Sequence, residues 1–321
     1  MSAEHLKIPV RVSEIAVVNA LVTRFSFTAL DGAELPTFSG GSHVIVEFGT
    51  CMNPYSLMSS PFDTRSYSIS VRRDDAGRGG SLYLHKNLKI GDEGLISHPL
   101  NLFPLNLRAR KHLFLAGGIG ITPFIAQMAQ LSQPGQRATP PFELHFCAQS
   151  AGLAAYADAL KAQYGGRVST YFDDQEQKLE LAQLLQGQPL GTHVYVCGPA
   201  GMINWVRKTA ADLGWPDTVV HFEHFSAPQA GTPFDVHLAR SGRSIRVSER
   251  QSLLEALEAA QLDPPYLCRG GACGQCETQV LACDGELVHR DHWLSDEEHA
   301  SGQKIMPCVS RIRGRSITID R

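Results

Sequence analysis

Short runs of alternating hydrophobic and polar residues fill the first third of the chain. From residue 7 to about residue 105 they include Ile15-Ala-Val-Val, Val44-Ile-Val-Glu-Phe and Tyr67-Ser-Ile-Ser-Val, separated by turn signals such as Asp31-Gly32 and Gly91-Asp92. Alternation of this kind is typical of half-buried strands. Strands this short and closely spaced predict a small antiparallel β-barrel.

The pattern changes at Lys111, where strands begin to alternate with helices. The apolar run His112-Leu-Phe-Leu-Ala-Gly is followed by an expected helix from Pro123 to about Leu131. Further strands are expected over 142–147, 192–197 and 218–222, with helices over 151–163 and 201–213. This alternation predicts an α/β module with a parallel sheet and helical crossovers.

A small, polar, proline-bearing segment, residues 226–233, is typical of a linker. The stretch from Phe234 to Arg321 has its own strand patterns and one helix, which the capping box Ser252-Leu-Leu-Glu255 opens. We therefore expect a multi-domain protein with modules over residues 1–107, 108–226 and 227–321, the last including the linker.

Composition narrows the class of protein. The 321 residues are 43% hydrophobic and 19% charged, as expected of a packed globular chain. The net charge of −3 gives no overall attraction to nucleic acid or to an anionic membrane. No apolar run approaches the roughly 20 residues of a transmembrane helix. The N-terminal residues lack the apolar core and cleavage site of a signal peptide, so we expect a cytoplasmic protein.

Five of the eight cysteines lie after residue 267. Cys268, Cys273 and Cys276 have the spacing C-x4-C-x2-C, and Cys308 follows about thirty residues later, which is the plant-type pattern for a 2Fe–2S cluster. Glycines between them let backbone N–H groups turn toward sulfur. A structural zinc, which usually takes paired C-x2-C knuckles, is the weaker interpretation. Cys283 competes for the fourth position but falls within an expected strand, so we expect it to be a free thiol.

Two glycine-containing turns end strands of the α/β module. The first, Ala116-Gly117-Gly118-Ile-Gly120-Ile-Thr122-Pro123, also opens a helix, so its backbone N–H groups suit a pyrophosphate. It is not the Rossmann fingerprint, because Pro123 replaces the third glycine, and a purely structural turn stays open. The second, Cys197-Gly198-Pro199, ends a later strand, and ligands bind at the carboxyl ends of parallel strands.

The two turns, in this order after a β-barrel, resemble those of the ferredoxin–NADP reductase superfamily. The resemblance implies that the first turn holds the pyrophosphate of a nicotinamide cofactor and that the second lies beside the nicotinamide. Asp173-Asp174 would repel a ribose 2′-phosphate, which favours NADH, although two solvated acids are the alternative. Cys197 is expected to shape hydride transfer by packing or polarity and not as a nucleophile, because no base motif accompanies it.

In that superfamily the barrel holds a flavin through an R-x-Y-S motif, and two segments compete for this role. Arg65-Ser-Tyr67-Ser68 matches literally but runs into the expected strand that contains residues 70–72. We therefore choose Asn53-Pro-Tyr55-Ser56. Tyr55 is expected to pack on the isoalloxazine while Ser56 reaches its N5 edge, and a position in the barrel core is the alternative for Tyr55.

The segment Gly79-Gly80-Ser81 resembles the flavin phosphate site of the superfamily, with N–H groups and a hydroxyl at a helix start. Asn53 stands where the motif has arginine. A bidentate charge on the phosphate is then missing unless Arg72, Arg65 or Arg78 replaces it. We expect the flavin to be held less tightly than in relatives that carry the arginine.

The order of modules, a flavin barrel, a nicotinamide module and a C-terminal plant-type ferredoxin, closely resembles the phthalate dioxygenase reductase family over roughly residues 7–321. Shared motifs include Gly77-Arg-Gly-Gly-Ser, Asn101-Leu-Phe-Pro-Leu, His221-Phe-Glu-His-Phe225 and Met306-Pro-Cys308-Val-Ser. The resemblance implies FMN as the flavin, an α+β (β-grasp) ferredoxin module and a monomer. It also places Phe225 against the flavin ring, with ordinary core packing as the alternative.

The implied function is that of an NADH-dependent reductase that passes single electrons through the cluster to the terminal oxygenase of a Rieske-type system. Rival functions are a reductase for a di-iron hydroxylase or a cytochrome P450, a stand-alone ferric or flavin reductase, and a zinc-stabilised binding module without activity. Six acidic residues between positions 284 and 298 form a solvated face or, as a second interpretation, a rim that steers the oxygenase.

The expected site residues fall into three groups. The catalytic residues are Ser56, Cys197 and Phe225, and the metal ligands are Cys268, Cys273, Cys276 and Cys308. The residues expected to bind FMN or NADH are Asn53, Tyr55, Ser56, Ser70, Val71, Arg72, Gly79, Gly80, Ser81, Gly117, Gly118, Gly120, Thr122, Pro123, Asp173, Cys197, Gly198, Pro199 and Phe225.

Overall fold

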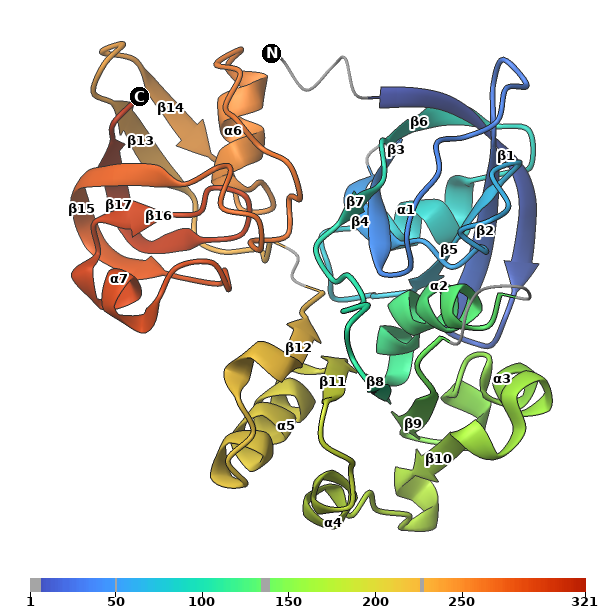
Figure 1. The fold of residues 1–321 in the computed structure, drawn as a ribbon. Helices are drawn as coiled ribbons and strands as arrows, with labels where there is room; N and C mark the ends of the chain where they lie inside the picture. Colours follow the sequence, from blue (N-terminus) through green and yellow to red (C-terminus); the bar gives the residue numbers. More distant parts are fainter. Residues whose placement is uncertain (1–6, 50, 134–138, 226–227) are drawn as a thin grey trace.

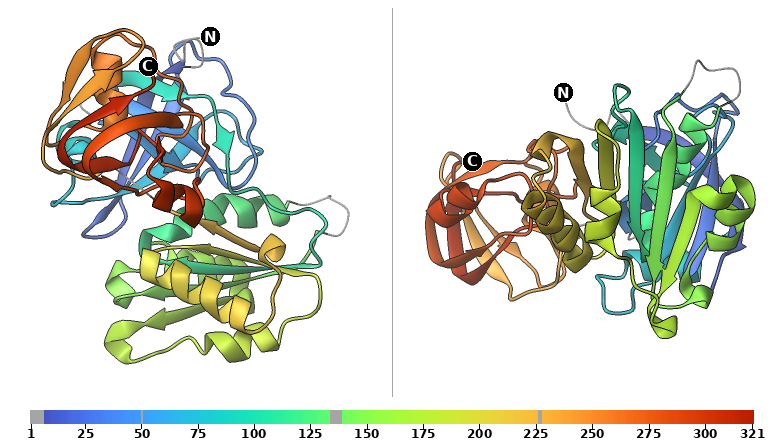
Figure 2. Two further views of the ribbon diagram at one scale, coloured as in Figure 1. Left: turned by 90° about the vertical axis from the view of Figure 1, so that its left-hand side faces the viewer. Right: turned by 60° about the horizontal axis from the view of Figure 1, so that its bottom comes forward.

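Three sheets follow one another along the chain and lie around a common centre (Figure 1). The computed structural model describes residues 7–49, 51–133, 139–225 and 228–321. The barrel and the α/β module are stacked, and the C-terminal module, orange to red, lies beside both of them (Figure 2). The expected multi-domain architecture of barrel, parallel α/β module and α+β ferredoxin module is confirmed.

The first sheet is an antiparallel barrel with the strand order β4-β3-β6-β1-β2-β5 and β7 paired to β3. Alternate residues of its strands, such as Phe25, Phe27 and Ile69, are buried in the interior, which is the pattern that predicted the barrel. Its elements are β1 (Lys7–Val17), β2 (Val22–Ala29), β3 (Ser42–Phe48), β4 (Cys51–Ser56), β5 (Tyr67–Arg72), α1 (Gly80–Asn87), β6 (Glu93–Ser97) and β7 (Leu100–Asn101).

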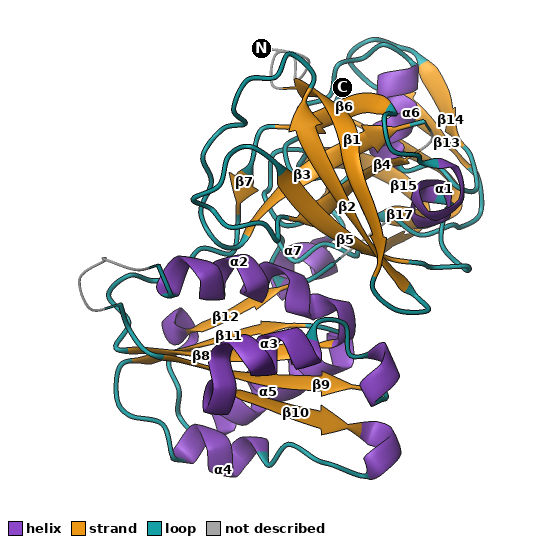
Figure 3. Ribbon diagram, turned by 90° about the vertical axis from the view of Figure 1, so that its right-hand side faces the viewer, coloured by secondary structure: helices purple, strands orange, loops and turns teal. Residues whose placement is uncertain are grey.

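The second sheet is parallel, with the order β10-β9-β8-β11-β12, and helices cover both of its faces (Figure 3). Apolar residues of α2 and α3 pack on one face and those of α4 and α5 on the other. The order reverses between β8 and β11, so a crevice opens at their carboxyl ends. The elements are β8 (Lys111–Gly117), α2 (Thr122–Leu131), β9 (Phe142–Ala148), α3 (Ala157–Tyr164), β10 (Val168–Phe172), α4 (Leu181–Gln186), β11 (Thr192–Cys197), α5 (Ala200–Asp212) and β12 (Val220–Glu223).

The third sheet is mixed, with the order β14-β13-β17-β15-β16 and a parallel pair of β13 and β17 at its centre. Ser252 and Glu255 form the expected capping box at α6. The sequence predicted one helix here; a second, α7, begins with its own capping box of Ser295 and Glu298, a signal that we missed. The elements are β13 (Phe234–Leu238), β14 (Ser244–Val247), α6 (Leu253–Ala259), β15 (Thr278–Val288), α7 (Asp296–Ser301), β16 (Lys304–Ile305) and β17 (Arg311–Ile319).

The barrel and the α/β module meet closely at α2. A Cβ on Gly40 would lie 2.5 Å from the Cα of Gln127, and the Gln127 side chain donates to the Phe103 carbonyl at 2.7 Å. The predicted module boundary between residues 107 and 108 falls in the connection between β7 and β8. The predicted boundary between residues 226 and 227 lies outside the described residues. None of the helices in the described part of the chain combines the length and apolar character that crossing a bilayer requires.

Three histidines come together where β8, β11 and β12 begin to run side by side. The His193 and His221 rings are stacked, and His193 Nδ1 lies 2.9 Å from His221 Nε2. His112 is fully buried, and among the described residues neither of its ring nitrogens has a hydrogen-bond partner. Burial, with a smaller contribution from the other two histidines, lowers the pKa of His112 to about 4. His112 is therefore neutral in the folded protein.

We predict that His112→Phe flattens the acid side of the stability profile. Above pH 6.5 the wild-type histidine is neutral in both states; between pH 6.5 and 4 only the unfolded chain takes up the proton. This uptake costs the folded state up to about 1.4 kcal/mol per pH unit. Urea unfolding at pH 7, 5.5 and 4.5 measures the slope, and an unchanged slope in the variant would contradict the prediction.

Candidate functional site

A cavity of about 1270 Å³ lies where the three modules meet. All three modules contribute to its wall, so the site exists only when they are assembled. Residues of its wall include Asn53, Tyr55, Ser56, Ser70, Arg72, Gly79, Gly80, Ser81, Thr122, Glu223, Phe225, Cys268, Gly270, Ala272 and His292.

The barrel side of the cavity combines a strand end with a helix start. Asn53 Nδ2 on β4 lies 3.5 Å from Tyr55 Oη, and a Cβ on Gly80 would lie only 2.4 Å from the same amide nitrogen. The Asn53 amide thus reaches the turn where α1 begins. Ser56 is buried, and its hydroxyl has no hydrogen-bond partner among the described residues. An unpartnered hydroxyl on a cavity wall suits a polar ring edge.

The literal Arg-Ser-Tyr-Ser match is not on this wall. Tyr67 is buried in the barrel core, where its hydroxyl donates to the Pro36 carbonyl, and Arg65 is paired with the exposed Asp63. The structure thus places the Asn53 segment on the cavity, as we chose. Val71, which we expected to contact the cofactor, has its side chain in the barrel core, because alternate residues of β5 face opposite sides.

The three candidate replacements for the missing arginine have different positions. Arg72 lies on the cavity wall and Arg65 does not. Arg78 also borders the cavity, but its guanidinium is paired with Glu255 of the C-terminal module. Arg72 is therefore the best-placed cation for an FMN phosphate.

The two glycine turns touch each other at the carboxyl ends of β8 and β11. A Cβ on Gly120 would lie 2.2 Å from the Cys197 carbonyl oxygen, and a Cβ on Gly198 would lie 3.0 Å from the Cα of Gly117. Side chains are therefore excluded there, and backbone N–H groups and the start of α2 are left to face a ligand. Asp173 follows β10 at the same edge of the sheet, as expected for contact with a ribose.

Cys197 is completely buried, and burial raises the pKa of its thiol well above the usual value. It is therefore a neutral thiol at neutral pH, in line with a packing role and not with nucleophilic chemistry. Phe225 lines the cavity and is 47% exposed, so it is not an ordinary core residue.

Sequence reasoning missed Glu223 at the end of β12. Its carboxyl is buried on the cavity wall, Oε2 has no hydrogen-bond partner among the described residues, and burial raises its pKa to about 8. The signal was an acid at the end of the largely apolar run Val219-Val-His-Phe-Glu, because a charged residue is seldom buried without a partner.

Four of the five cysteines of the C-terminal module, Cys268, Cys273, Cys276 and Cys308, lie close together, and Cys268 borders the cavity. The sulfurs of Cys276 and Cys308 lie 3.3 Å apart, and the Gly270 N–H points at the Cys268 sulfur from 3.4 Å. The Cys273 thiol and backbone N–H groups of the loop lower the pKa of Cys268, which favours the thiolate that a metal requires. Cys283, the competitor for the fourth ligand position, packs against a different hydrophobic cluster of the module from the one that contains Cys276 and Cys308.

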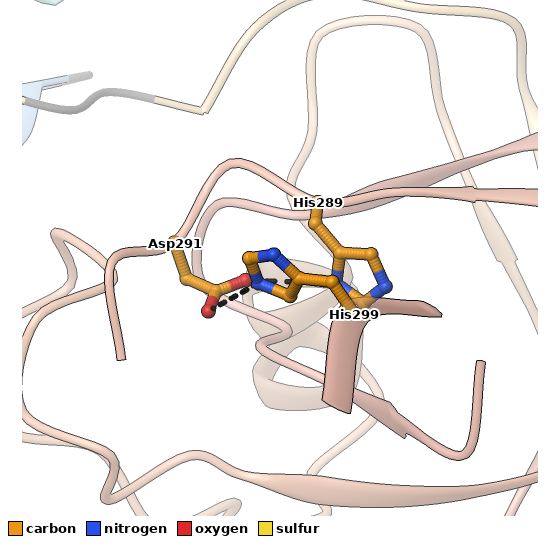
Figure 4. Close-up of side chains that lie close together, drawn as sticks. All are labelled: His289, Asp291 and His299. Carbon is orange, nitrogen blue, oxygen red and sulfur yellow. Dashed lines mark hydrogen bonds and ion pairs between the residues drawn. The ribbon is translucent and has the colours of Figure 1, made fainter. Parts of the chain in front are cut away.

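Behind this loop, His289, Asp291 and His299 form a compact group (Figure 4). Asp291 accepts hydrogen bonds from Leu294 N–H at 3.0 Å and Ser310 Oγ at 3.1 Å, and His299 Nε2 lies 3.1 Å from it. The two imidazole rings are stacked 4.2 Å apart and are 21° from parallel. Because imidazole lone pairs lie in the ring planes, rings stacked in this way do not converge on one ion. The group is a hydrogen-bonded support for the loop.

The residues present fit three groups. Four cysteines on a glycine-rich loop match a 2Fe–2S cluster. The cavity with its unpartnered Ser56 hydroxyl and Arg72 suits FMN, and the backbone cradle of Gly117 and Gly198 suits the nicotinamide cofactor.

Comparisons with known proteins agree with this assignment. Residues 95–220 match the model described as dimethylamine monooxygenase subunit DmmA-like, N-terminal domain, and residues 236–313 match the 2Fe-2S iron-sulfur cluster binding domain. The heme-dependent oxidative N-demethylase beta subunit of Ectopseudomonas mendocina is 48% identical over 97% of this chain and 98% of its own. The carnitine monooxygenase reductase subunit of Escherichia coli is 42% identical over 99% of both chains.

Among solved structures, phthalate dioxygenase reductase matches with a TM-score of 0.88 and 32% identity, over 98% of each chain. The chain belongs to the phthalate dioxygenase reductase family. As a member of this reductase family it is an NADH-dependent oxidoreductase that carries FMN and a 2Fe–2S cluster and serves an oxygenase component.

We predict that Cys308→Ser abolishes the cluster and that Cys283→Ser keeps it. Cys308 faces Cys276 at the loop, whereas Cys283 packs on the other core, so the first change alone removes a ligand. Iron analysis and the visible spectrum after anaerobic reconstitution measure this as a fall from about two irons per chain to near zero. Loss of iron in Cys283→Ser would contradict the assignment.

Arg72→Gln is expected to weaken FMN binding, while the matched change Arg65→Gln has no effect. A charge-assisted contact to phosphate contributes about 1.5–3 kcal/mol, so the FMN dissociation constant should rise roughly 10- to 100-fold. Fluorescence titration of the deflavinated protein with FMN measures both constants. Equal constants for wild type and Arg72→Gln would remove Arg72 from the phosphate site.

Proposed function

We propose that this protein is the reductase component of a Rieske-type oxygenase system. The observation that carries the proposal is the shared cavity, which the flavin turn, the end of the nicotinamide module and the cysteine loop border together. A stand-alone flavin or ferric reductase would have no use for the third of these walls.

The nicotinamide module holds its ligand mainly by backbone. Gly117, Gly118, Gly120 and Thr122 supply backbone N–H groups for the pyrophosphate, and Pro123, which has no N–H, fixes the start of α2 beside them. Gly198 and Pro199 lie beside this turn and border the place for the nicotinamide. Asp173 would accept hydrogen bonds from a ribose 2′-hydroxyl and repel a 2′-phosphate, which supports NADH as the donor.

The barrel orients the flavin. Tyr55 and Ser56 offer a ring face and an unpartnered hydroxyl, and Ser70 borders the same cavity. Gly79, Gly80 and Ser81 with Asn53 and Arg72 form the phosphate end. Phe225 borders the same cavity from the nicotinamide module and offers an aromatic face to it. Together these residues hold two ligands in register, which is the main contribution that a protein makes to hydride transfer.

Burial keeps two ionisable side chains at the ends of β11 and β12 in their protonated forms. Glu223 stays protonated at neutral pH because its pKa is raised to about 8, and Cys197 stays a thiol. Both groups are therefore neutral at neutral pH.

When bound, NADH, FMN and the 2Fe–2S cluster together convert one hydride into two single electrons. The chain contributes the path: Cys268, Gly270 and Ala272 put the cysteine loop directly on the cavity wall. Trp293 covers Gly274 on this loop and is half exposed.

The acidic rim proposed for docking loses most of its free charge. Asp291 is buried, and Asp284, Glu286 and Glu298 are paired with Arg315, Arg313 and Lys304. Asp296 and Glu297 form none of the ion pairs found among the described residues. Strong electrostatic steering of a basic oxygenase is therefore not supported. Docking of the oxygenase would depend more on direct contacts near the cluster than on long-range attraction.

A haem-dependent oxygenase subunit is a second candidate for the electron acceptor, because one relative at 48% identity is the beta subunit of a heme-dependent oxidative N-demethylase. The two candidates differ only in the partner, since the reductase chemistry upstream is the same. A cytoplasmic location and a monomeric state remain predictions, and light scattering tests the second of them.

The test is a visible spectrum of the purified protein before and after anaerobic addition of NADH. We expect flavin and iron–sulfur absorption that decrease together, and we expect the reduced protein to reduce a Rieske oxygenase faster than a haem-dependent one. Cys308→Ser serves as the control that blocks delivery. A protein without visible absorption after reconstitution would overturn the proposal, and faster reduction of the haem partner would favour the second candidate.

A further inference from the structure

Arg78 joins the flavin turn to the C-terminal module. Its Nη1 lies 2.6 Å from Glu255 Oε2 and its Nη2 lies 3.1 Å from Oε1, which is a bidentate ion pair. Nη1 also donates to the Arg250 carbonyl at 2.8 Å. The side chains of Arg78 and Glu255 are only 15% and 26% exposed, so solvent screens the pair less than it screens a surface ion pair.

Glu255 is itself held rigidly. It is the last residue of the α6 capping box and the third residue of the helix. Ser252 N–H donates to its Oε2 at 2.7 Å, and its own N–H donates to Ser252 Oγ at 3.1 Å. Burial raises the pKa of Glu255, but the hydrogen bonds from Arg78 and Ser252 outweigh this, so the pKa is lowered and the carboxyl is charged. Arg78 therefore contacts a fixed point of the module.

His224 and His292 make a second contact, between the end of the nicotinamide module and the C-terminal module. Their rings are stacked with centroids 3.6 Å apart and planes within 14° of parallel. The backbone N–H of His292 donates to the Gly271 carbonyl at 3.0 Å. Gly271 belongs to the cysteine loop, so the contact between the two histidines is joined to that loop by one hydrogen bond.

The connection between the modules does not by itself orient them. Arg311 donates to the carbonyls of Gly231 and Thr232 and holds the described end of the linker on the C-terminal module. A tether of this kind keeps two bodies close but leaves rotation free. One point contact leaves rotation about that point. A second contact, to a different module, leaves only rotation about the line that joins the two points, and the held end of the linker restricts this remaining rotation.

We propose that Arg78–Glu255 and His224–His292 form a two-point clamp that seats the C-terminal module with its cysteine loop in the cavity wall. This seating sets the rate of transfer from flavin to cluster, in which one electron leaves the flavin and one arrives at the cluster. The clamp rests on the proposed function, because it has a role only when electrons leave through the cluster.

Glu255→Gln tests the first contact without disturbing the helix, because glutamine also completes a capping box. His224→Ala tests the second contact. Glu298→Gln is the matched control: it makes the same change in the capping box of α7, where the ion-pair partner is Lys304 and the residue does not border the cavity. All variants are compared as full-length protein loaded with FMN and cluster.

The Cys308→Ser variant, which lacks the cluster, is used to choose two electron acceptors. An acceptor that this variant still reduces takes its electrons from the flavin. An acceptor that it no longer reduces takes them from the cluster. We expect Glu255→Gln and His224→Ala each to lower the ratio of cluster-level to flavin-level rates by about fivefold, the double variant to lower it further, and Glu298→Gln to match wild type. Iron content should stay the same throughout.

Small-angle X-ray scattering gives a readout that does not depend on activity. The double variant should have a larger radius of gyration than wild type and Glu298→Gln, because the C-terminal module is released from the cavity. A double variant with the same radius of gyration as wild type and a rate ratio within about twofold of wild type would overturn the clamp. If Cys308→Ser instead keeps the reduction of every acceptor tried, the proposed function fails, which is a different result from failure of the clamp.

Discussion

The contact of three modules around one cavity is the constraint on which the rest of this structure depends. Each module buries its own core, and none of them encloses the site alone. Barrel and α/β module meet at α2, where Gly40 lets two backbones touch. The C-terminal module is held by fewer and more polar contacts, and relative motion is the usual expectation for such an interface. Positioning of the cysteine loop is therefore the step most sensitive to single substitutions.

Close backbone approach builds the nicotinamide side. Gly117 and Gly120 on one turn and Gly198 on the next leave no room for a Cβ, so the ends of β8 and β11 come close enough to share one ligand. The reversal of strand order between these two strands explains why the ligand site is there. The glycines thus act by the absence of a side chain, which lets their backbone N–H groups face the ligand.

Burial decides the charge of several groups in the α/β module. His112 and Cys197 have no strong opposite charge to stabilise an ion, so each is neutral at neutral pH, and Glu223 keeps its proton for the same reason. Glu255 is partly buried and has Arg78 and Ser252 as partners, and it is charged. The charge of a buried group therefore depends on whether it has a hydrogen-bond or ion-pair partner and not on burial alone, because an unpaired buried charge is costly.

Spacing along the chain was enough to predict the groups that come from one continuous segment. The cysteine loop, the two glycine turns, the α6 capping box and the choice of Asn53-Pro-Tyr-Ser over the literal Arg-Ser-Tyr-Ser motif could all be argued from neighbours in sequence. The sequence by itself also determined the order of barrel, parallel sheet and ferredoxin module, because hydrophobic periodicity reflects which faces of an element are buried. Only the tertiary structure decided that Arg72 borders the cavity while Arg78 is paired with Glu255, that Val71 faces the core, and that His224 meets His292. These pairings join residues far apart in the chain, and their partners depend on how whole modules are placed, which no local pattern encodes.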